Sequence, residues 1–206
     1  MSSVNVGLPV FMDYANTHGF GRMSLVRRQR RRIQDPGRPA FIYYGAAVGA
    51  LSRSLASTDP EAELDRMVAG ATANQTRHYA ELRDGMLAFL GQRRVSRVPV
   101  AGRCVWSTDG LRVTVRQHVG LRLRNGQQHV VLLYLKEAPL TPSAADAALR
   151  IMETVAPTLL PEATPRVLDV RRGRMLALRA NASRQYLDGW LRGEALGYMA
   201  LWDAAA

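Results

Sequence analysis

The only lysine of this chain, Lys136, stands near the end of the largely apolar segment Leu111 to Glu137. Three roles are open to a single ammonium group in such surroundings: a catalytic site, the end of a structural hairpin, or a surface for nucleic acid. The end of a strand is the simplest position, because a lysine there buries its aliphatic stem and keeps its charge in water. A catalytic role needs acidic partners from elsewhere in the chain.

Few other residues are spaced for catalysis or metal binding. No two of the four histidines have the i, i+4 spacing of a helical zinc site. His118 and His129 fall on one face of an expected hairpin, but about 13 Å apart at the usual strand rise. Cys104 lies in a strand pattern and is typical of a small core residue. We therefore predict no metal site and no cofactor.

The stretch HGFGRMS, from His18 to Ser24, places Gly19 and Gly21 before an expected helix. A glycine-rich turn at a helix N-terminus can hold a phosphate group through its backbone N–H groups. The third glycine and the lysine of a phosphate loop are missing here. The stretch therefore predicts a turn.

The first ninety residues carry apolar side chains at helical spacing, separated by stop signals. Asp59, Pro60 and Glu61 form a typical helix start, and Gly91 is a typical helix end. No element is assigned before Phe20. The expected helices are Ser24 to Ile33, Pro39 to Leu51, Pro60 to Val68 and Ala73 to Leu90.

Beyond the basic segment Gln92 to Gly102 the pattern changes from a helical period to a period of two. The chain is predicted to be an α+β protein with N-terminal helices, an antiparallel three-stranded meander followed by a helix and further strands, and a C-terminal helix. Its two regions, 1–91 and 92–206, are expected to pack as one globular unit. The expected elements of the second region are the strands Cys104 to Thr108, Leu111 to Arg124 and Gln127 to Lys136, the helix Ser143 to Val155, the strand Arg166 to Arg171 and a helix from Ser183.

Side chains alternate between the two sides of the expected strand over the fourteen residues from Leu111 to Arg124. Such a strand has one buried face and, in this chain, one cationic face. A two-residue turn at Asn125-Gly126 would set Arg122 opposite His129. The next strand is apolar on both sides from Val130 to Leu135, which predicts a central strand covered on both faces.

This order of a helix, three antiparallel strands, a helix and a strand resembles the core of the restriction-endonuclease-like PD-(D/E)xK superfamily over about Ala73 to Arg171. The resemblance implies that Lys136, at the end of the third strand, polarises an attacking water molecule. It also implies a divalent metal held by an aspartate on the second strand and by an acid two residues before the lysine. Gln117 and Tyr134 stand at those two positions, and neither supplies the charge that Mg²⁺ requires.

The expected site is therefore not catalytic in its usual form. A nuclease would need an acid from Glu81 or Asp84 on the preceding helix, or from Glu137. In that alternative the catalytic residues are Lys136, Glu81 and Asp84, and Mg²⁺ is the cofactor.

The net charge of +11 and the sequence pI near 10.9 favour a polyanionic partner. All but one of the 28 basic residues are arginine, a skew that is also typical of a GC-rich genome. No aromatic residue is interleaved in the cationic face of the hairpin, so we expect contact with phosphates more than reading of bases. The candidate contacts are Arg27, Arg28, Arg30, Arg31 and Arg32 in the first expected helix, Arg112, Arg116, Arg122 and Arg124 in the hairpin, and Arg171, Arg172 and Arg174 near the last strand.

The leading hypothesis is a protein that binds DNA or RNA without hydrolysing it. The alternatives are a metal-dependent nuclease and a subunit that binds an acidic protein partner. No apolar run reaches the roughly 18 to 20 residues of a membrane span, and the N-terminus lacks the pattern of a signal peptide. With one cysteine and hence no intrachain disulfide, a cytoplasmic protein without membrane contact is expected.

Overall fold

The computed structural model describes residues 3–35, 42–116 and 118–205. Within these ranges the protein has seven α-helices, eight β-strands and one 3₁₀ turn. The expected α+β class is confirmed, with a mainly helical N-terminal part and a C-terminal helix, although a short strand, Val4–Gly7, precedes the helices. No helix in the described part of the chain is both long and apolar enough to cross a membrane.

The N-terminal part contains the expected helices and two elements that the sequence pattern did not indicate. Helix α4 begins after Asp59, whose side chain accepts a hydrogen bond from the backbone N–H of Ala62 at 3.0 Å. Helix α5 begins with a capping box between Thr72 and Gln75. Strand β1 and helix α1 lie in the unassigned start, and the expected helix start at Pro39 falls outside the described residues. The bounds are β1 Val4–Gly7, α1 Leu8–Ala15, α2 Gly21–Gln34, α3 Ile42–Ser54, α4 Pro60–Ala69 and α5 Ala73–Gln92.

The remaining strands form two sheets, followed by the last helix. A three-stranded sheet has the order β1-β4-β3, and a five-stranded sheet has the order β2-β5-β6-β7-β8. Strands β6 and β7 are parallel and are joined through α6. The bounds are β2 Val95–Val98, β3 Cys104–Thr108, β4 Leu111–Val115, β5 His118–Leu123, β6 Gln128–Tyr134, α6 Pro142–Leu159, β7 Thr164–Asp169, β8 Arg174–Leu176 and α7 Arg184–Ala204, with the 3₁₀ turn η1 at Val170–Arg172.

The expected meander is divided between these two sheets. The segment Leu111 to Arg124 is not one strand, because its first half is β4 in the small sheet and its second half is β5 in the large sheet. The alternation is disturbed already at Thr114, which is buried, and from His118 to Leu121 four successive residues are buried. Strand β5 is therefore covered on both faces, which a single solvated strand would not be.

The β5–β6 hairpin differs from the expected register by one residue. The N–H of Gly126 donates to the carbonyl of Leu123 at 2.9 Å, and Gly126 has a φ of 84°. The longer turn that results pairs Arg122 with Gln128, where a two-residue turn would have paired Arg122 with His129. A shift of one residue changes the face on which each side chain of the second strand lies relative to its neighbours.

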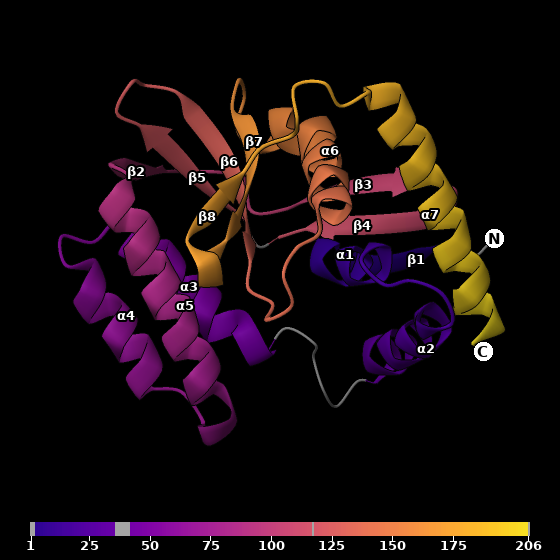
Figure 1. Ribbon diagram of the computed structural model, residues 1–206, viewed down its shortest axis with the longest axis horizontal. Helices are drawn as coiled ribbons and strands as arrows, with labels where there is room; N and C mark the ends of the chain where they lie inside the picture. Colours follow the sequence, from indigo (N-terminus) through magenta and orange to yellow (C-terminus); the bar gives the residue numbers. More distant parts are fainter. Residues whose placement is uncertain (1–2, 36–41, 117, 206) are drawn as a thin grey trace.

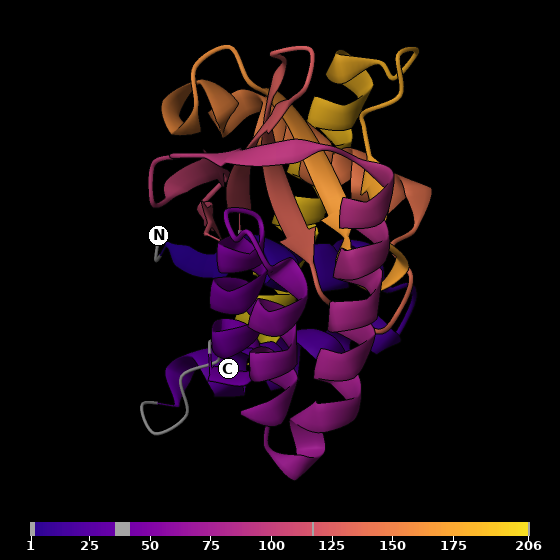
Figure 2. The ribbon, with the colours of Figure 1, turned by 90° about the vertical axis from the view of Figure 1, so that its left-hand side faces the viewer.

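Strand β6 is the centre of the molecule, as predicted. Its alternate side chains Val130, Leu132 and Tyr134 belong to the apolar cluster that also contains α6. Val131 and Leu133 belong to a second cluster, formed with α3, α4 and α5. Figures 1 and 2 show these three helices side by side at one end of the molecule, on the face of the large sheet opposite to α6.

Helix α6 has the large sheet on one side and the small sheet, α1 and α7 on the other, within one apolar cluster (Figure 1). The order helix, three antiparallel strands, helix, parallel strand is present as α5, β2, β5, β6, α6 and β7. Its first antiparallel strand is β2 and not the expected Cys104 to Thr108, which pairs with β4 in the small sheet.

Helix α5 touches the turn η1 through a glycine. A Cβ atom at Gly85 would overlap the carbonyl oxygen of Val170, whereas a Cβ at Gly91, in the same helix, would meet no atom within 4 Å.

We expect Gly85→Ala to lower the free energy of unfolding by roughly 1–3 kcal/mol or more, because the helix must move away from the turn. Gly91→Ala should raise it by up to about 1 kcal/mol, since alanine is the better helix former. Urea unfolding of both variants measures the difference, and equal effects would contradict this account of the packing.

A buried histidine joins β5 to the loop after β2. The Nε2 of His118 lies 2.8 Å from the carbonyl oxygen of Ala101, and because a carbonyl only accepts, Nε2 carries the proton. Its Nδ1 is buried without a hydrogen-bond partner among the described residues. Burial lowers the pKa of His118, because a charged ring would place an unpaired N–H in the interior.

The protein should therefore lose stability in mild acid. The unfolded chain takes up a proton at His118 as the pH falls through about 6.5, while the folded protein resists until its lower pKa is reached. The loss of stability grows as the pH falls from about 6.5 to the lower pKa of His118 in the folded protein, and it does not increase below that pKa. His118→Gln keeps a donor for Ala101 but does not titrate, so its midpoint of thermal unfolding should fall less between pH 7.5 and pH 5. An identical pH dependence in the two proteins would overturn the assignment.

Candidate nucleic-acid interface

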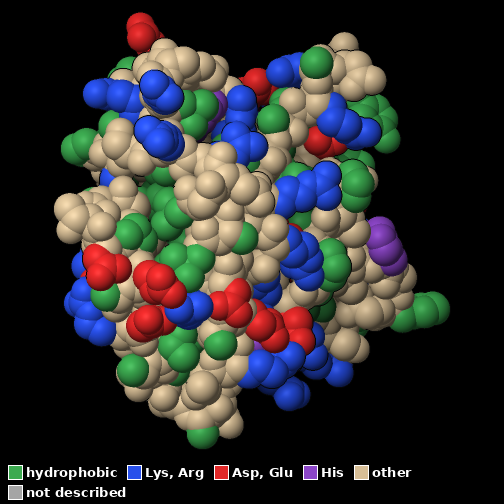
Figure 3. Space-filling model, turned by 60° about the vertical axis from the view of Figure 1, so that its left-hand side comes forward, with side chains coloured by type: hydrophobic (Ala, Val, Ile, Leu, Met, Phe, Trp, Pro, Cys, Tyr) green, Lys and Arg blue, Asp and Glu red, His purple; other side chains and the backbone are tan. Residues whose placement is uncertain are grey.

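Many of the described arginines form ion pairs with carboxylates of the described residues. They include Arg22, Arg53, Arg66, Arg77, Arg83, Arg150, Arg171, Arg172, Arg179, Arg184 and Arg192. Figure 3 shows acidic side chains gathered at the height of α4 and α5 and basic ones gathered above, at the height of the β5–β6 hairpin. Many of the carboxylates on this face therefore lie beside the helices and not beside the hairpin.

A group of positive side chains without ion pairs lies where α5 ends against the large sheet. Arg93 caps the C-terminus of α5, and Arg166 projects from β7 in register with Val131. Burial, and then the charge of Arg93, lower the pKa of Arg166. Burial lowers the pKa of His129 as well, and Arg166 and Arg93 add to that effect. The two arginines therefore repel each other, and a proton on His129 would add a third positive charge.

Strand β2 extends this positive charge along the edge of the sheet. Arg97 is opposite Leu121, and Arg122 is opposite Ser96 on the neighbouring strand. Each of these arginines is exposed. We call the six arginines Arg93, Arg94, Arg97, Arg122, Arg124 and Arg166 the basic edge; none of them forms an ion pair with a carboxylate among the residues that the structure describes.

The basic edge has the chemistry of an anion-binding surface. Guanidinium groups donate several hydrogen bonds in a fixed plane and match the oxygens of a phosphate. Charges on an edge strand also prevent pairing with another sheet. That role explains Arg97 on β2, but it does not explain why Arg166, on an interior strand, is held near Arg93 and His129.

The first predicted group of arginines lies on α2, and most of its members are exposed and could contact a ligand. Arg27, Arg28, Arg31 and Arg32 are exposed and have no ion pair within the described ranges. Arg30 differs, because its Nη1 donates to the carbonyl of Trp202 at 2.6 Å and its guanidinium lies over the Trp202 ring. Arg30 therefore joins α2 to α7.

The second predicted group does not form the single cationic face that was expected. Arg112 is on β4 in the small sheet, whereas Arg122 and Arg124 belong to the hairpin of the large sheet. Arg116 lies in the connection between the two strands and is exposed. Arg122 and Arg124 belong instead to the basic edge, together with Arg97 of β2.

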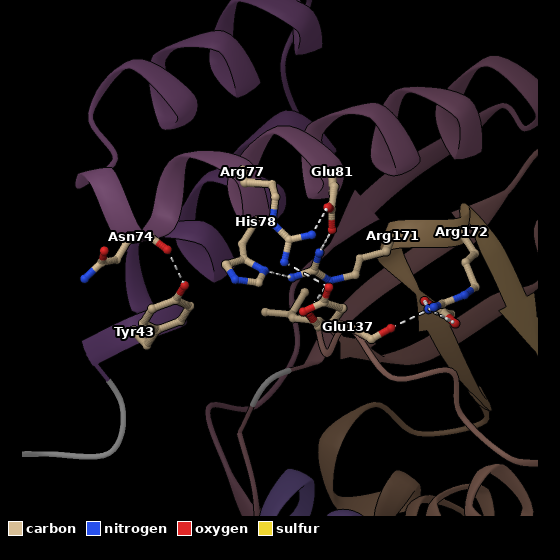
Figure 4. A network of polar contacts seen from close by, with 10 residues as sticks. Tyr43, Asn74, Arg77, His78, Glu81, Glu137, Arg171 and Arg172 are labelled. Carbon is tan, nitrogen blue, oxygen red and sulfur yellow. Dashed lines mark hydrogen bonds and ion pairs between the residues drawn. The ribbon is translucent and has the colours of Figure 1, made fainter.

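The third predicted group is mainly used inside the protein (Figure 4). The Arg171 side chain is only 4% exposed; its Nε donates to the carbonyl of Leu135 at 2.9 Å, and its guanidinium contacts Glu81 and the Nδ1 of His78. Arg172 binds Asp169 at 3.0 Å and donates to the Glu137 carbonyl at 2.8 Å. Arg174 is exposed and has no ion pair in the described part of the chain.

Lys136 is held by an acid that the sequence did not indicate. Its Nζ lies 2.9 Å from an Asp13 carboxylate oxygen, contributed by α1. The nearby Tyr134 hydroxyl donates to the Ala138 carbonyl at 2.7 Å, and burial followed by the charges of Asp13 and Asp169 raises the pKa of Tyr134 to about 12.

The acids proposed for the nuclease alternative are engaged elsewhere. Glu81 binds Arg171 and, at 3.1 Å, Arg77, while Asp84 binds Arg83 at 2.9 Å. Neither forms an ion pair with Lys136. A search of the described residues finds no group of three histidine, cysteine or acidic side chains placed to hold a metal ion.

Three arginines that the sequence prediction did not include lie in the basic segment Gln92 to Gly102, at the boundary between the two expected regions. Arg93, Arg94 and Arg97 occur there in the stretch QRRVSR. Arg166 lies about seventy residues further along the chain, and no local signal places it near Arg93. Only the pairing of β6 with β7 brings the two together.

A cavity of about 250 Å³ lies between the N-terminal parts of α6 and α7. Its lining includes Ser143, Tyr186 and Trp190, together with Asp146, which is buried and already paired with Arg179. Neither a histidine nor a cysteine lines it. Its one carboxylate, Asp146, is engaged by Arg179.

Comparison with known proteins gives no relative for this chain: no family model, no curated protein and no solved structure matches it.

Removing one charge from the repelling group should stabilise the fold. We expect Arg93→Gln to raise the free energy of unfolding by about 0.3 kcal/mol at low salt and neutral pH, because its repulsion of Arg166 disappears. Arg66→Gln is the matched control, since Arg66 has an ion pair with Glu63 at 2.8 Å and its loss should not stabilise. Urea unfolding at about 20 mM and 500 mM salt measures both; the gain should vanish at high salt. A loss of stability in Arg93→Gln would contradict the repulsion.

Proposed function

We propose that this protein binds DNA or RNA through the phosphate backbone and does not hydrolyse it. The observation that carries the proposal is the basic edge, where the charge of Arg93 acts on Arg166 and no carboxylate of the described residues forms an ion pair with either of them. The Nη1 of Arg166 donates to the carbonyl of Pro165 at 2.9 Å, but this bond brings no negative charge to offset the repulsion. A bound polyanion would supply that charge.

The strength and salt dependence of such binding follow from the number of contacts. Each phosphate that an arginine neutralises releases condensed counterions, which drives association. If all six arginines of the basic edge contact phosphates of a duplex, the slope of log K against log salt is about −5. The contacts are with the backbone, so little dependence on base sequence is expected.

An acidic protein partner is the less favoured of the binding alternatives. Protein interfaces depend on a few buried aromatic or aliphatic anchors surrounded by polar residues. The six members of the basic edge are all arginines, and the exposed large apolar side chains that the structure describes lie elsewhere, on α2, α3 and α7. Such a surface suits a repeating anion better. The single cysteine fits a reducing compartment, so a cytoplasmic location is part of the proposal.

A metal-dependent nuclease of the PD-(D/E)xK type is the second candidate. The order α5, β2, β5, β6, α6, β7 with Lys136 just after β6 favours it, as does Asp13 beside that lysine. The ion pairs of Glu81 with Arg77 and of Asp84 with Arg83 argue against this candidate. One carboxylate beside a lysine supplies fewer oxygen ligands than Mg²⁺ takes from a protein and its substrate together.

The basic edge can be tested with charge-matched double variants. Arg97→Gln/Arg122→Gln should weaken binding to a mixed-sequence nucleic acid about tenfold or more and reduce the salt slope by about 2, because two phosphate contacts are lost. Arg66→Gln/Arg192→Gln changes the net charge equally, but removes arginines that are paired with Glu63 and Asp109. Fluorescence anisotropy over a salt series compares them. Equal affinity of the two double variants would remove the basic edge from the proposal.

Hydrolysis can be tested on the same complexes. A gel that resolves intact and cleaved strands, with and without Mg²⁺, should show salt-sensitive binding and intact nucleic acid in both conditions, because the metal-binding acids are missing. Cleavage that requires Mg²⁺ and is abolished by Lys136→Ala would establish the nuclease instead. Lys136→Ala should otherwise leave binding unchanged, since the lysine is occupied by Asp13.

A further inference from the structure

A fully exposed aromatic ring stands at the start of the arginine-rich helix. Phe20 is 100% exposed, and it precedes α2 directly. Its chain neighbours are Gly19 and Gly21, which have no side chains to shield the ring. Gly19 has a φ of 59°, a conformation that glycine adopts without strain. Single exposed apolar residues are common on protein surfaces, so the exposure of Phe20 gains meaning only from its surroundings.

Those surroundings are exposed arginines, three on the face of the helix that carries Phe20 and a fourth beside that face. Phe20 has helical backbone angles, so the helical repeat extends back to it. Residues at i, i+7, i+8 and i+11 project from one face of a helix. From Phe20 these positions are Arg27, Arg28 and Arg31, all exposed, and Arg32 borders the same face.

The opposite face fixes α2 to the rest of the molecule. Val26 is completely buried, and the Gln29 side chain donates to the Val10 carbonyl at 3.0 Å and accepts from the Tyr198 hydroxyl at 2.9 Å. At the start of the helix Arg22 binds Glu194 at 2.9 Å. The ring and the arginines are therefore presented on a rigid support, which lowers the entropic cost of binding.

We propose that this face of α2 binds single-stranded nucleic acid, with Phe20 stacked on an unpaired base and Arg27, Arg28 and Arg31 on the phosphates. The inference rests on the proposed function and adds to it a second surface and a class of ligand. Phe20 and Arg31 are about 16 Å apart along the helix, from eleven rises of 1.5 Å. That length corresponds to about five nucleotides of a stacked strand at 3.4 Å each, and to fewer in an unstacked one.

A single strand fits the ring better than a duplex. Bases in a duplex are stacked on both faces, whereas a single strand offers free π faces that stack on aromatic side chains without sequence preference. A membrane surface fits less well, because an interfacial helix needs a continuous apolar face. The exposed face of α2 carries Phe20 and four arginines, and the apolar face with Val26 is already covered. Ile33, which is 40% exposed, is thirteen residues after Phe20 and so projects from another side of the helix.

The test compares a single strand of mixed sequence with an abasic strand of equal length and charge. Phe20→Ala should bind the mixed strand roughly 5- to 150-fold more weakly, the range expected for the loss of one stacked base. It should bind the abasic strand and a duplex as the unchanged protein does. Phe20→Trp should keep the affinity for the mixed strand. Tyr186→Ala is the matched control, because Tyr186 is an aromatic residue 71% exposed at the start of α7, away from these arginines.

The arginines are tested by the salt slope. Arg27→Gln/Arg31→Gln should lower the slope for a single strand by about 1.4, which is 0.7 for each phosphate, while Phe20→Ala should leave the slope unchanged.

The outcomes separate this inference from the proposed function. Salt-dependent binding that is weakened in Arg97→Gln/Arg122→Gln but unchanged in Phe20→Ala would overturn the inference and leave the proposed function standing. If Phe20→Ala lost affinity equally for the mixed strand, the abasic strand and the duplex, the inference would also be overturned, because the ring would then not be stacking on a base. Absence of any binding by the unchanged protein would overturn both. Weaker binding of Phe20→Ala to vesicles of anionic lipid, with no change for the mixed strand, would assign the surface to a membrane.

Discussion

The rest of the structure depends on the burial of strand β6 on both of its faces. Its alternating side chains enter two separate apolar clusters, one with α6 and one with α3, α4 and α5. Such a strand is stable only if every backbone group is paired, and β5 and β7 supply that pairing on its two sides. Because β7 runs parallel to β6, the chain must cross over between them, and α6 makes the crossing. This crossing then forces α6 to lie between the two sheets.

The same arrangement decides which charges are free. Where β6 and β7 end, Arg171, Arg172 and Lys136 reach carboxylates on neighbouring elements and become part of the internal framework. At the opposite ends of these strands no carboxylate of the described residues forms an ion pair with Arg166 or Arg93. Arg93 is exposed, and Arg166 is half-buried and donates to the carbonyl of Pro165 at 2.9 Å. A half-buried charge without an opposite charge is costly to hold, so selection of the fold alone would not favour it. The distribution of the acids, more than the number of arginines, defines the basic edge.

The two proposed surfaces differ in how they are built and in their electrostatic cost to the free protein. The basic edge is built from three elements that are distant in sequence, and its members repel one another. The exposed face of α2 is built from one helix, and its arginines follow from local spacing. The first surface bears an electrostatic cost in the free protein, while the second is held rigid by Val26, Gln29 and Arg22 on its opposite side. Both are matched to a ligand with repeated negative charge, and only the α2 face adds an aromatic ring.

The sequence by itself determined the helices α2 to α5, the α+β class and the central position of β6, because apolar spacing, caps and a doubly apolar run are local properties of the chain. It also located the arginines of α2. The tertiary structure decided that Leu111 to Arg124 is two strands in two sheets, since a regular alternation does not report where a chain leaves one sheet for another. It decided the hairpin register through one extra turn residue, and the partner of Lys136 through the packing of α1. It alone brought Arg166 to Arg93, because the contact depends on strand pairing between residues that are far apart in the chain, and no local pattern encodes which distant charges will meet.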